Sequence, residues 1–210
     1  GDDLDLAAMA VSEAVKEAER LAGSPFPAAF INVSGGHIRS EEGYASETIS
    51  GDPPDIKNSD LDRLIQKVKD LPLAPDEDMI HLIPNEFALD GIGGVHHPVG
   101  MAARKMEVKA CRILARHAPL QNLLRSVDRA QVEVAGLMVH ALASGEAVLH
   151  DNEKKEGVIL LDLGEGTSDV AFYAHASVQH VSVVPIGGYY FTRDIALGLQ
   201  IEWEQAEKLK

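Results

Sequence analysis

A glycine-rich segment, Asp162-Leu-Gly-Glu-Gly-Thr-Ser-Asp169, has the residue types and spacing best suited to chemistry in this chain. Glycine has no Cβ, so a turn with Gly164 and Gly166 can present several backbone N–H groups to a phosphate. Asp162 could hold the hydration shell of Mg²⁺, which keeps waters and takes one or two protein carboxylates beside phosphates. The segment lacks the Gly-Lys-Ser/Thr of a Walker loop and the following helix of a Rossmann fingerprint. The residues alone leave open a phosphate site or an ordinary tight hairpin turn.

The elements that must position this segment are short strands. Val158–Leu163 is an almost wholly apolar run that predicts a buried strand ending near Asp162. Two further strands are expected at 170–173 and 178–184, joined by a turn at 175–177, and a helix is expected at 190–199. This order predicts a β meander and not a βαβ crossover.

The preceding part of the chain predicts a strand, helix, strand, strand order. Helical spacing covers residues 4–22 and stops at Gly23 and Pro25. The elements expected next are a buried strand at 28–34, a polar hairpin-like stretch to 54, a helix capped by Ser59, a strand at 79–83, a glycine-rich loop at 91–100 and a strand at 106–114. Helical spacing resumes at 120–127 and at 136–149, before a solvated turn at 151–156, and places a domain boundary near 116–118.

Length, charge and cysteine usage exclude several classes of protein. The 210 residues carry 19 basic and 33 acidic side chains, a net charge of −14 that opposes binding to nucleic acid. Residues 101–130 are basic, which indicates either a solvated face or a docking surface, and no aromatic residue there could stack on bases. The single cysteine, Cys111, is expected to be a small buried residue in a reducing compartment. No apolar run is long enough to span a membrane.

Two other groups of residues do not support a site. His96 and His97 are adjacent on an extended loop, so their rings point apart and no acidic or thiol ligand stands at metal-binding spacing. Ser34 and His37 lack a partner acid for a hydrolase.

The glycine-rich segment belongs to a longer pattern. Together with Val183-Val-Pro-Ile-Gly-Gly188 and Thr192-Arg-Asp-Ile-Ala196, it resembles the second phosphate-binding strand pair of the actin-like ATPases, in particular the FtsA family of bacterial cell-division proteins. Segments that agree with this family are Ala18–Gly23, Asn32–His37, His81–Phe87 and Pro98–Met101. The resemblance spans nearly the whole chain.

The resemblance implies an α/β fold with an α+β insertion, an internal fragment of the actin-like ATPase fold. Residues 1–26 would be a helix linking from a missing N-terminal subdomain, and 27–116 the inserted 1C subdomain with its strand, helix, strand, strand order. Residues 117–200 would form the core of subdomain IIA, part of the ribonuclease-H-like core with its β meander, and 201–210 the start of IIB.

The resemblance also implies ATP and Mg²⁺ as cofactors, with at most slow ATP hydrolysis and no catalytic side chain assigned. Asp162 would lie on the magnesium side, reaching the ion through water, and the phosphate-facing residues would be Gly164, Glu165, Gly166, Thr167, Gly187 and Gly188. Glu207 and Lys210, one helical turn apart, would flank the nucleoside, with a solvated helix face as the alternative. Glu165 departs from the small residue usual in the family, and a carboxylate beside a triphosphate opposes binding unless a metal or a lysine intervenes.

As a function, the resemblance implies an ATP-binding scaffold of the divisome, cytoplasmic and peripheral on the inner face of the membrane at the division site. It would link FtsZ filaments to the membrane, self-associate, and recruit later division proteins through 27–116. FtsZ would bind mainly to IIB, and the membrane through a C-terminal helix absent from this sequence. The alternative is a protein-interaction adaptor similar to the pilus-assembly relatives, with little or no nucleotide binding, which Glu165 favours. A sugar or acetate kinase of the same superfamily would lack the inserted 27–116 module.

Overall fold

The structure is a computed structural model that describes residues 3–52 and 54–210. Its helices are α1 (Leu4–Ala22), α2 (Asn58–Lys69), α3 (His117–Arg129), α4 (His140–Val148), α5 (Asp151–Glu156), α6 (Gly188–Leu199) and α7 (Trp203–Leu209). Its strands are β1 (Ala29–Val33), β2 (Ile38–Thr48), β3 (Glu77–Leu89), β4 (Ile92–Val95), β5 (Lys105–Arg116), β6 (Val134–Val139), β7 (Val158–Leu163), β8 (Ser168–Ala174) and β9 (Ser177–Val184).

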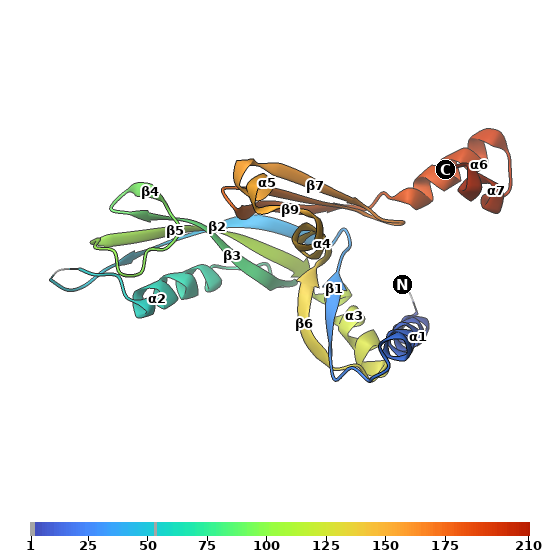
Figure 1. The fold of residues 1–210 in the computed structure, drawn as a ribbon, viewed down its shortest axis with the longest axis horizontal. Coiled ribbons are helices and arrows are strands. Elements are labelled where there is room, and N and C mark those ends of the chain that lie inside the picture. The colour runs from blue at the N-terminus through green and yellow to red at the C-terminus, as the bar shows by residue number, and fades with distance from the viewer. Residues whose placement is uncertain (1–2, 53) are drawn as a thin grey trace.

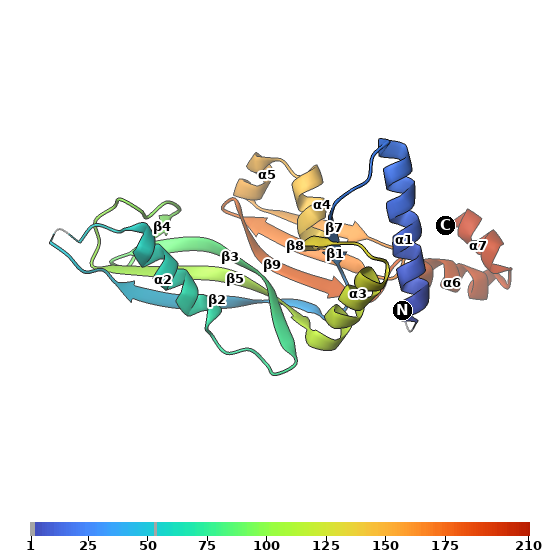
Figure 2. The same cartoon turned by 90° about the horizontal axis from the view of Figure 1, so that it is seen from below.

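Most of the strands form one long sheet with the order β4-β3-β5-β2-β9-β8-β7. Helix α2 and strands β2, β3, β4 and β5 make up one end of the molecule in Figure 1, and we call residues 38–116 the α2 subdomain. Strands β7, β8 and β9 are antiparallel neighbours, which confirms the predicted meander. Figure 2 shows how the sheet continues from the α2 subdomain into the meander.

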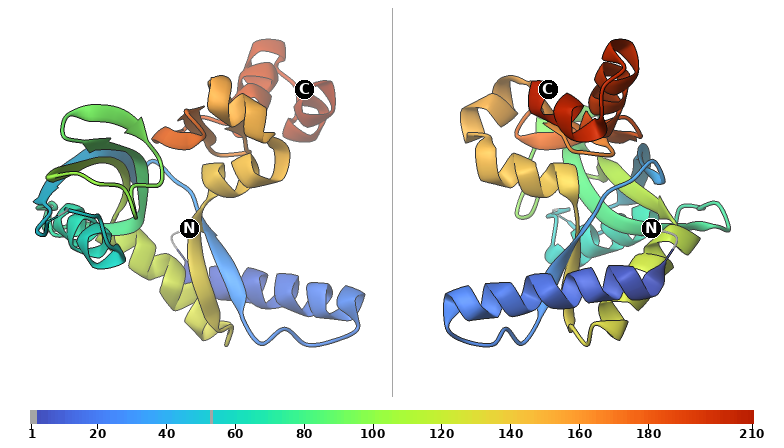
Figure 3. Two further views of the ribbon diagram at one scale, coloured as in Figure 1. Left: turned by 60° about the vertical axis from the view of Figure 1, so that its left-hand side comes forward. Right: turned by 90° about the vertical axis from the view of Figure 1, so that its right-hand side faces the viewer.

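Strands β1 and β6 stand apart from this sheet as a parallel pair. Figure 3 shows the pair running between α1 at one end and α4 at the other. Helices α6 and α7 extend from the end of β9, away from the rest of the chain (Figure 1). No helix among residues 3–52 and 54–210 is long and apolar enough to cross a membrane.

Local signals explain where two of the helices begin and end. Asp3 caps α1, because its carboxylate accepts from the N–H groups of Asp5 and Leu6, and Gly23 ends the helix in the left-handed conformation (φ 71°). The prediction that Ser59 caps α2 is wrong: the N-cap is Lys57, and the carboxylate of Asp60 accepts its N–H at 2.8 Å. A carboxylate in the first turn takes the role because it also lies at the positive end of the helix dipole.

Two hydrophobic cores stabilise the fold. The first joins β1, β6 and α4 to the meander and to one half of the α2 subdomain's strands, through residues such as Val33, Val139, Val181 and Ile113. The second lies beneath α2 and contains Leu64, Val68, Met106 and Val108, among others. Strands β2, β3 and β5 therefore pass from one core into the other.

The structure corrects several predicted elements. The hairpin predicted before residue 54 is not formed over residues 35–52, because 38–48 form one strand, β2, between β5 and β9. The first strand of the predicted strand, helix, strand, strand order is therefore β2, while the segment predicted at 28–34 pairs with β6. Residues 136–139 belong to strand β6 instead of a helix, and 151–156 form helix α5 instead of a turn.

The basic segment and the cysteine lie mainly in and beside β5. Arg112 is only 3% exposed and pairs with Glu41 at 2.8 Å, so the prediction of a solvated face is wrong at this position. Its guanidinium also donates to the carbonyl oxygen of Leu71 at 2.9 Å, which ties the segment after α2 to the sheet. Cys111 is buried as predicted, and burial raises the pKa of its thiol to about 11.

Candidate phosphate-binding site

The glycine-rich turn between β7 and β8 is closed on itself and leaves several amide groups free. The N–H of Gly164 donates to the carbonyl oxygen of Thr167 at 2.9 Å. The next three N–H groups, of Glu165, Gly166 and Thr167, make no hydrogen bond to any residue that the structure describes. Successive unpaired N–H groups form a concavity that favours an anion, so this turn can hold a phosphate.

The glycine pair before α6 supports this turn from behind. A Cβ on Gly187 would lie 2.5 Å from the carbonyl oxygens of Gly164 and Glu165, a distance that no side chain tolerates. Gly188 donates its N–H to the carbonyl oxygen of Gly164 at 2.9 Å, and Tyr189 donates to that of Glu165 at 2.8 Å. These contacts use the turn's carbonyl groups and none of the N–H groups of residues 165–167.

A buried hydroxyl group connects the end of α7 to the glycine pair. Thr192 is fully buried, and its Oγ1 hydrogen-bonds to the carbonyl oxygen of Gly188 at 3.1 Å and to Glu207 at 2.5 Å. Glu207 pairs with Lys210 at 2.5 Å, and the ammonium of Lys210, followed by the Thr192 hydroxyl, lowers the pKa of the Glu207 carboxyl. A Cβ on Gly188 would lie 3.3 Å from Nζ of Lys210, so this ammonium lies over the glycine pair.

Two carboxylates face each other just before and after the turn. Asp162 and Asp169 are directly opposite partners in the β7–β8 ladder, so their side chains lie on the same face of the hairpin. Asp162 is half-buried: Ser144 of α4 donates to its Oδ2 at 2.5 Å, and Nε2 of His140 lies 3.1 Å from the same atom.

Asp169 is the buried member of this pair. It is 1% exposed, and Ser34, which follows β1, donates to both of its carboxylate oxygens. Oγ1 of Thr167, within the turn, donates to Oδ2 of Asp169 at 3.2 Å. The carboxylate therefore ties the β1 end to the phosphate turn.

Of the two facing carboxylates, Asp162 is the one that could face a hydrated cation, because Asp169 is buried and hydrogen-bonded. Among residues 3–52 and 54–210 no group of three or more His, Cys, Asp or Glu side chains is placed to hold a metal ion. Mg²⁺ keeps several waters and binds through one or two carboxylates beside phosphates. The donor set of Asp162 beside the open turn therefore fits Mg²⁺ bound through water.

The structure brings the predicted site residues together, although they come from β7, the turn, α6 and α7. The turn contacts Gly187 and Gly188 directly, and Lys210 and Glu207 reach it through Gly188 and Thr192. Glu165 is exposed, so its carboxylate can turn toward solvent. Lys210 lies over the neighbouring glycine pair, where its ammonium pairs with the carboxylate of Glu207.

The prediction of a buried strand at Val158–Leu163 is wrong for one face of β7. Ile159, Leu161 and Leu163 are 63%, 61% and 72% exposed, while Val158 and Leu160 pack against the first core. Asp162 lies on the covered face with Val158 and Leu160, which is why Ser144 and His140 can reach it.

Sequence reasoning missed four members of the site: Ser34, His140, Ser144 and Asp169. Ser34 was considered only with His37 as a hydrolase pair, and the structure shows its hydroxyl donating to Asp169 instead. Asp169 could have been found by counting, because a four-residue turn at 164–167 places residue 169 opposite residue 162. His140 and Ser144 carry no local signal, since α4 reaches Asp162 only through tertiary packing.

Comparison with known proteins finds similarity to one family. A family model described as "SHS2 domain inserted in FTSA" matches residues 35–114, and one described as "Cell division protein FtsA" matches residues 159–210. The cell division protein FtsA of Rhizobium meliloti is 33% identical over 208 residues, which are 99% of this chain and 47% of that protein. FtsA of Bacillus subtilis is 30% identical over 208 residues, with the same shares of the two chains. The chain thus spans about half the length of the curated relatives it matches.

A solved structure shares the fold without close sequence similarity. A chain of a structure described as the PilM–PilN type IV pilus biogenesis complex superposes with a TM-score of 0.65 at 14% identity, covering 96% of this chain and 55% of that chain. This likeness supports an actin-like ATPase fold, as the sequence predicted.

Proposed function

Because the chain belongs to the FtsA family, we propose that it is part of an ATP-binding scaffold of the bacterial cell-division machinery. The observation that carries the proposal is the turn at 164–167, which holds three unpaired N–H groups beside the facing carboxylates of Asp162 and Asp169. This arrangement suits the phosphates of a nucleotide with a hydrated Mg²⁺ beside them.

Each predicted residue has a role in this proposal. The amides of 165–167 would hold the phosphates, with Gly164 closing the turn, and Gly187 and Gly188 would keep the turn in place from behind. Asp162 would orient the water shell of Mg²⁺, which neutralises phosphate charge when bound. Glu207 and Lys210 would flank the nucleoside, where their mutual ion pair holds both side chains next to Gly188. ATP would act as a conformational and polymerisation ligand, with at most slow hydrolysis.

The partners follow from the family and not from this chain's surface. The whole protein would link FtsZ filaments to the inner face of the cytoplasmic membrane, self-associate and recruit later division proteins. Residues 27–116, as subdomain 1C, would supply protomer and partner contacts, and 117–200 would form one wall of the cleft as subdomain IIA. FtsZ would bind mainly to IIB, which 201–210 would begin, and a C-terminal helix outside this sequence would bind the membrane. Residues 1–26 would lead in from an N-terminal subdomain.

Sedimentation with lipid vesicles tests the proposal in the whole protein. FtsZ filaments are mixed with vesicles and the protein, with Mg-ATP, without nucleotide, and with an Asp162→Asn variant. We expect FtsZ to sediment with the vesicles in the presence of Mg-ATP, and to do so less with Asp162→Asn. Failure of the folded protein to bring FtsZ to the vesicles under any condition would contradict the division role.

A protein-interaction adaptor with little nucleotide binding is the second candidate. The exposed carboxylate of Glu165 on the phosphate turn favours it, because it adds negative charge where a triphosphate would lie. The same sedimentation separates the two functions. An adaptor would bring FtsZ to the vesicles equally well with and without Mg-ATP, and Asp162→Asn would have no effect.

A further inference from the structure

Strand β3 contains a bulge where its pairing with β5 shifts by one residue. Pro84 faces Ala110 and Glu86 faces Lys109, so Asn85 has no partner on β5. Pro84 lacks an N–H and cannot donate to the ladder, and a bulge bends a strand and redirects the extra side chain. Asn85 is therefore free to contact something other than its own sheet neighbour.

The bulge is a boundary beyond which β3 packs in the second core alone. Before it, Ile80 and Ile83 pack against the first core and Leu82 against the second, whereas after it Phe87 and Leu89 both belong to the second. On β5 the change occurs at the facing position, between Ala110 in the second core and Cys111 in the first. The distal half of the α2 subdomain thus packs as a unit of its own, and the bulge is where β3 can bend.

The Asn85 side chain crosses from this boundary to the start of β9. Its Nδ2 donates to Oε1 of Gln179 at 3.2 Å, and its Oδ1 accepts from Oγ of Ser177 at 3.0 Å. Gln179 donates in turn to the carbonyl oxygen of Ala174 at 3.0 Å. Where the side-chain amides of Asn85 and Gln179 contact each other, a donor therefore faces an acceptor.

The receiving side of this contact is fixed. The tight turn between β8 and β9 has positive φ angles at His175 and Ala176, and both residues donate their N–H groups to α5, to the carbonyl oxygens of Lys155 and Lys154. The turn is thus held in place by α5. The Asn85 contact therefore joins the α2 subdomain to a part of the chain that has its own hydrogen bonds.

Little backbone pairing joins the strands of the α2 subdomain to the meander of β7, β8 and β9. Among the described residues, β2 and β9 share one registered pair, Arg39 with Ser182. Beside it, Oγ of Ser40 accepts from the N–H of Val181 at 2.8 Å and lies 2.9 Å from its carbonyl oxygen. By contrast, the β2–β5 and β3–β5 ladders run along the full lengths of their strands.

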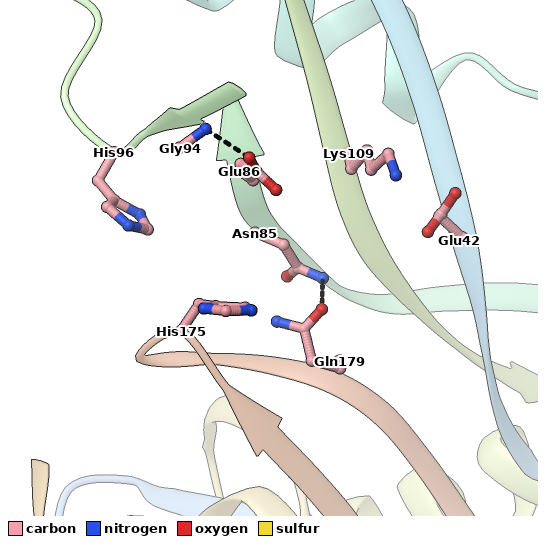
Figure 4. Close-up of a pocket in the computed structure, with 8 residues that line it drawn as sticks. All are labelled: Glu42, Asn85, Glu86, Gly94, His96, Lys109, His175 and Gln179. Atoms are coloured by element: carbon pink, nitrogen blue, oxygen red, sulfur yellow. Dashed lines mark hydrogen bonds between the residues drawn. The ribbon is translucent and has the colours of Figure 1, made fainter. Parts of the chain in front are cut away.

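A polar cavity of about 370 Å³ lies on this side of the bulge, as Figure 4 shows. One wall comes from the distal part of the α2 subdomain, with Glu86, His96 and Lys109, and the other from the β8–β9 turn and the start of β9, with His175 and Gln179. Because the walls belong to units packed in different cores, bending at the bulge changes the distance between them.

We propose that the Asn85 side chain is a latch that holds the distal half of the α2 subdomain against the β8–β9 turn, and that its release lets this half bend away at the bulge and widens the cavity. The latch is a conformational device of the fold. It rests on packing and hydrogen bonding alone, so it does not depend on the nucleotide role proposed above.

Pulsed electron paramagnetic resonance on the full chain tests the latch. Spin labels are attached at Asp62→Cys on α2 and Asn152→Cys on α5, both exposed positions in helices. The chain's single natural cysteine, Cys111, is buried with a raised pKa, so it resists labelling. The labelled chain is compared with its Asn85→Ala and Gln179→Ala versions; the second keeps the bulge sequence intact and removes the receiving amide, together with that amide's hydrogen bonds to the carbonyl oxygens of Ala174 and Ser177.

The matched control is Asn122→Ala, an exposed asparagine of α3 whose side chain makes no hydrogen bond to the described residues. We expect one narrow distance distribution for the parent and the control, and a broader distribution with a longer-distance component for Asn85→Ala and Gln179→Ala. Distributions in both variants identical to that of the parent would overturn the proposal. Equal broadening in Asn122→Ala would overturn it as well, because the effect would then not belong to the latch.

Discussion

Ser34 donates its hydroxyl to both carboxylate oxygens of Asp169, at 2.8 and 2.9 Å, and so joins the end of β1 to the beginning of β8. Asp169 is 1% exposed, and Thr167 of the phosphate turn binds the same carboxylate. One buried charge thus fixes both the parallel β1–β6 pair and the conformation of the turn. A buried carboxylate persists only where hydrogen bonds replace its hydration, which makes these two hydroxyl groups necessary.

Replacing Ser34 with alanine removes a hydrogen bond to a buried charge. We expect Ser34→Ala to lower the free energy of unfolding by about 1–3 kcal/mol, the usual cost of leaving such a group short of a partner. Urea unfolding followed by circular dichroism measures the change. The control is Ser59→Ala, an exposed serine in the first turn of α2 that does not cap the helix. Equal stability of the two variants would show that Asp169 does not need Ser34.

Gly187, the N-cap of α6, and Gly198, within α6, provide a second matched pair. A Cβ at Gly187 would meet two backbone carbonyl oxygens at 2.5 Å, whereas a Cβ at Gly198 would meet nothing within 4 Å. We expect Gly187→Ala to destabilise the protein and to shift the amide resonances of 164–167. Gly198→Ala should be neutral or stabilise by up to about 1 kcal/mol, since alanine is the better helix former. Thermal unfolding and amide spectra of both variants test this; an undisturbed turn in Gly187→Ala would contradict the packing described above.

His81 should give the stability a dependence on pH. Its Nε2 accepts the N–H of Val139 at 3.2 Å, and burial lowers its pKa below the ordinary value of 6.5. The unfolded chain then binds more protons than the native chain between the two pKa values, so the free energy of unfolding rises with pH through that window. His81 therefore contributes its full stability above the unfolded pKa and loses it as the pH falls toward the native value. Burial, and then the charge of Arg116, also lowers the pKa of His37, so His37 changes the free energy of unfolding in the same direction.

Urea unfolding between about pH 7.5 and pH 5 tests this sign. We expect the free energy of unfolding to fall on acidification, and His81→Gln, whose side-chain oxygen can still accept the Val139 N–H, to remove part of the fall. His97→Gln, in an exposed loop, is the control and should leave the slope unchanged. An identical slope in His81→Gln would show that His81 titrates alike in both states.

The sequence was most informative where structure is local. The apolar run 158–163, the glycine-rich turn and the Val-rich segment 178–184 each determine their own conformation, so the meander could be predicted. Strand β2 could not, because its Arg-Ser-Glu-Glu segment looks solvated, whereas ion pairs such as Arg112–Glu41 and Arg39–Glu77 compensate its charges. Strand β6 was missed because it pairs with β1, roughly a hundred residues earlier, and Val134–Val139 suits a helix equally well. The contribution of His140 to the site depends on that same long-range pairing.

Calorimetric titration of Mg-ATP tests the central claim, that residues 162–169 form the phosphate site. It is carried out on the whole protein, on Asp162→Asn, and on Asp128→Asn as a control, since Asp128 is an exposed residue of α3. Asp162→Asn preserves the side chain's shape and removes its charge. We expect saturable binding in the parent and the control, and binding weaker by about tenfold, a change of about 1.4 kcal/mol, with reduced Mg²⁺ dependence in Asp162→Asn. Unchanged affinity and unchanged Mg²⁺ dependence in Asp162→Asn, or no saturable binding by the folded parent, would contradict the account.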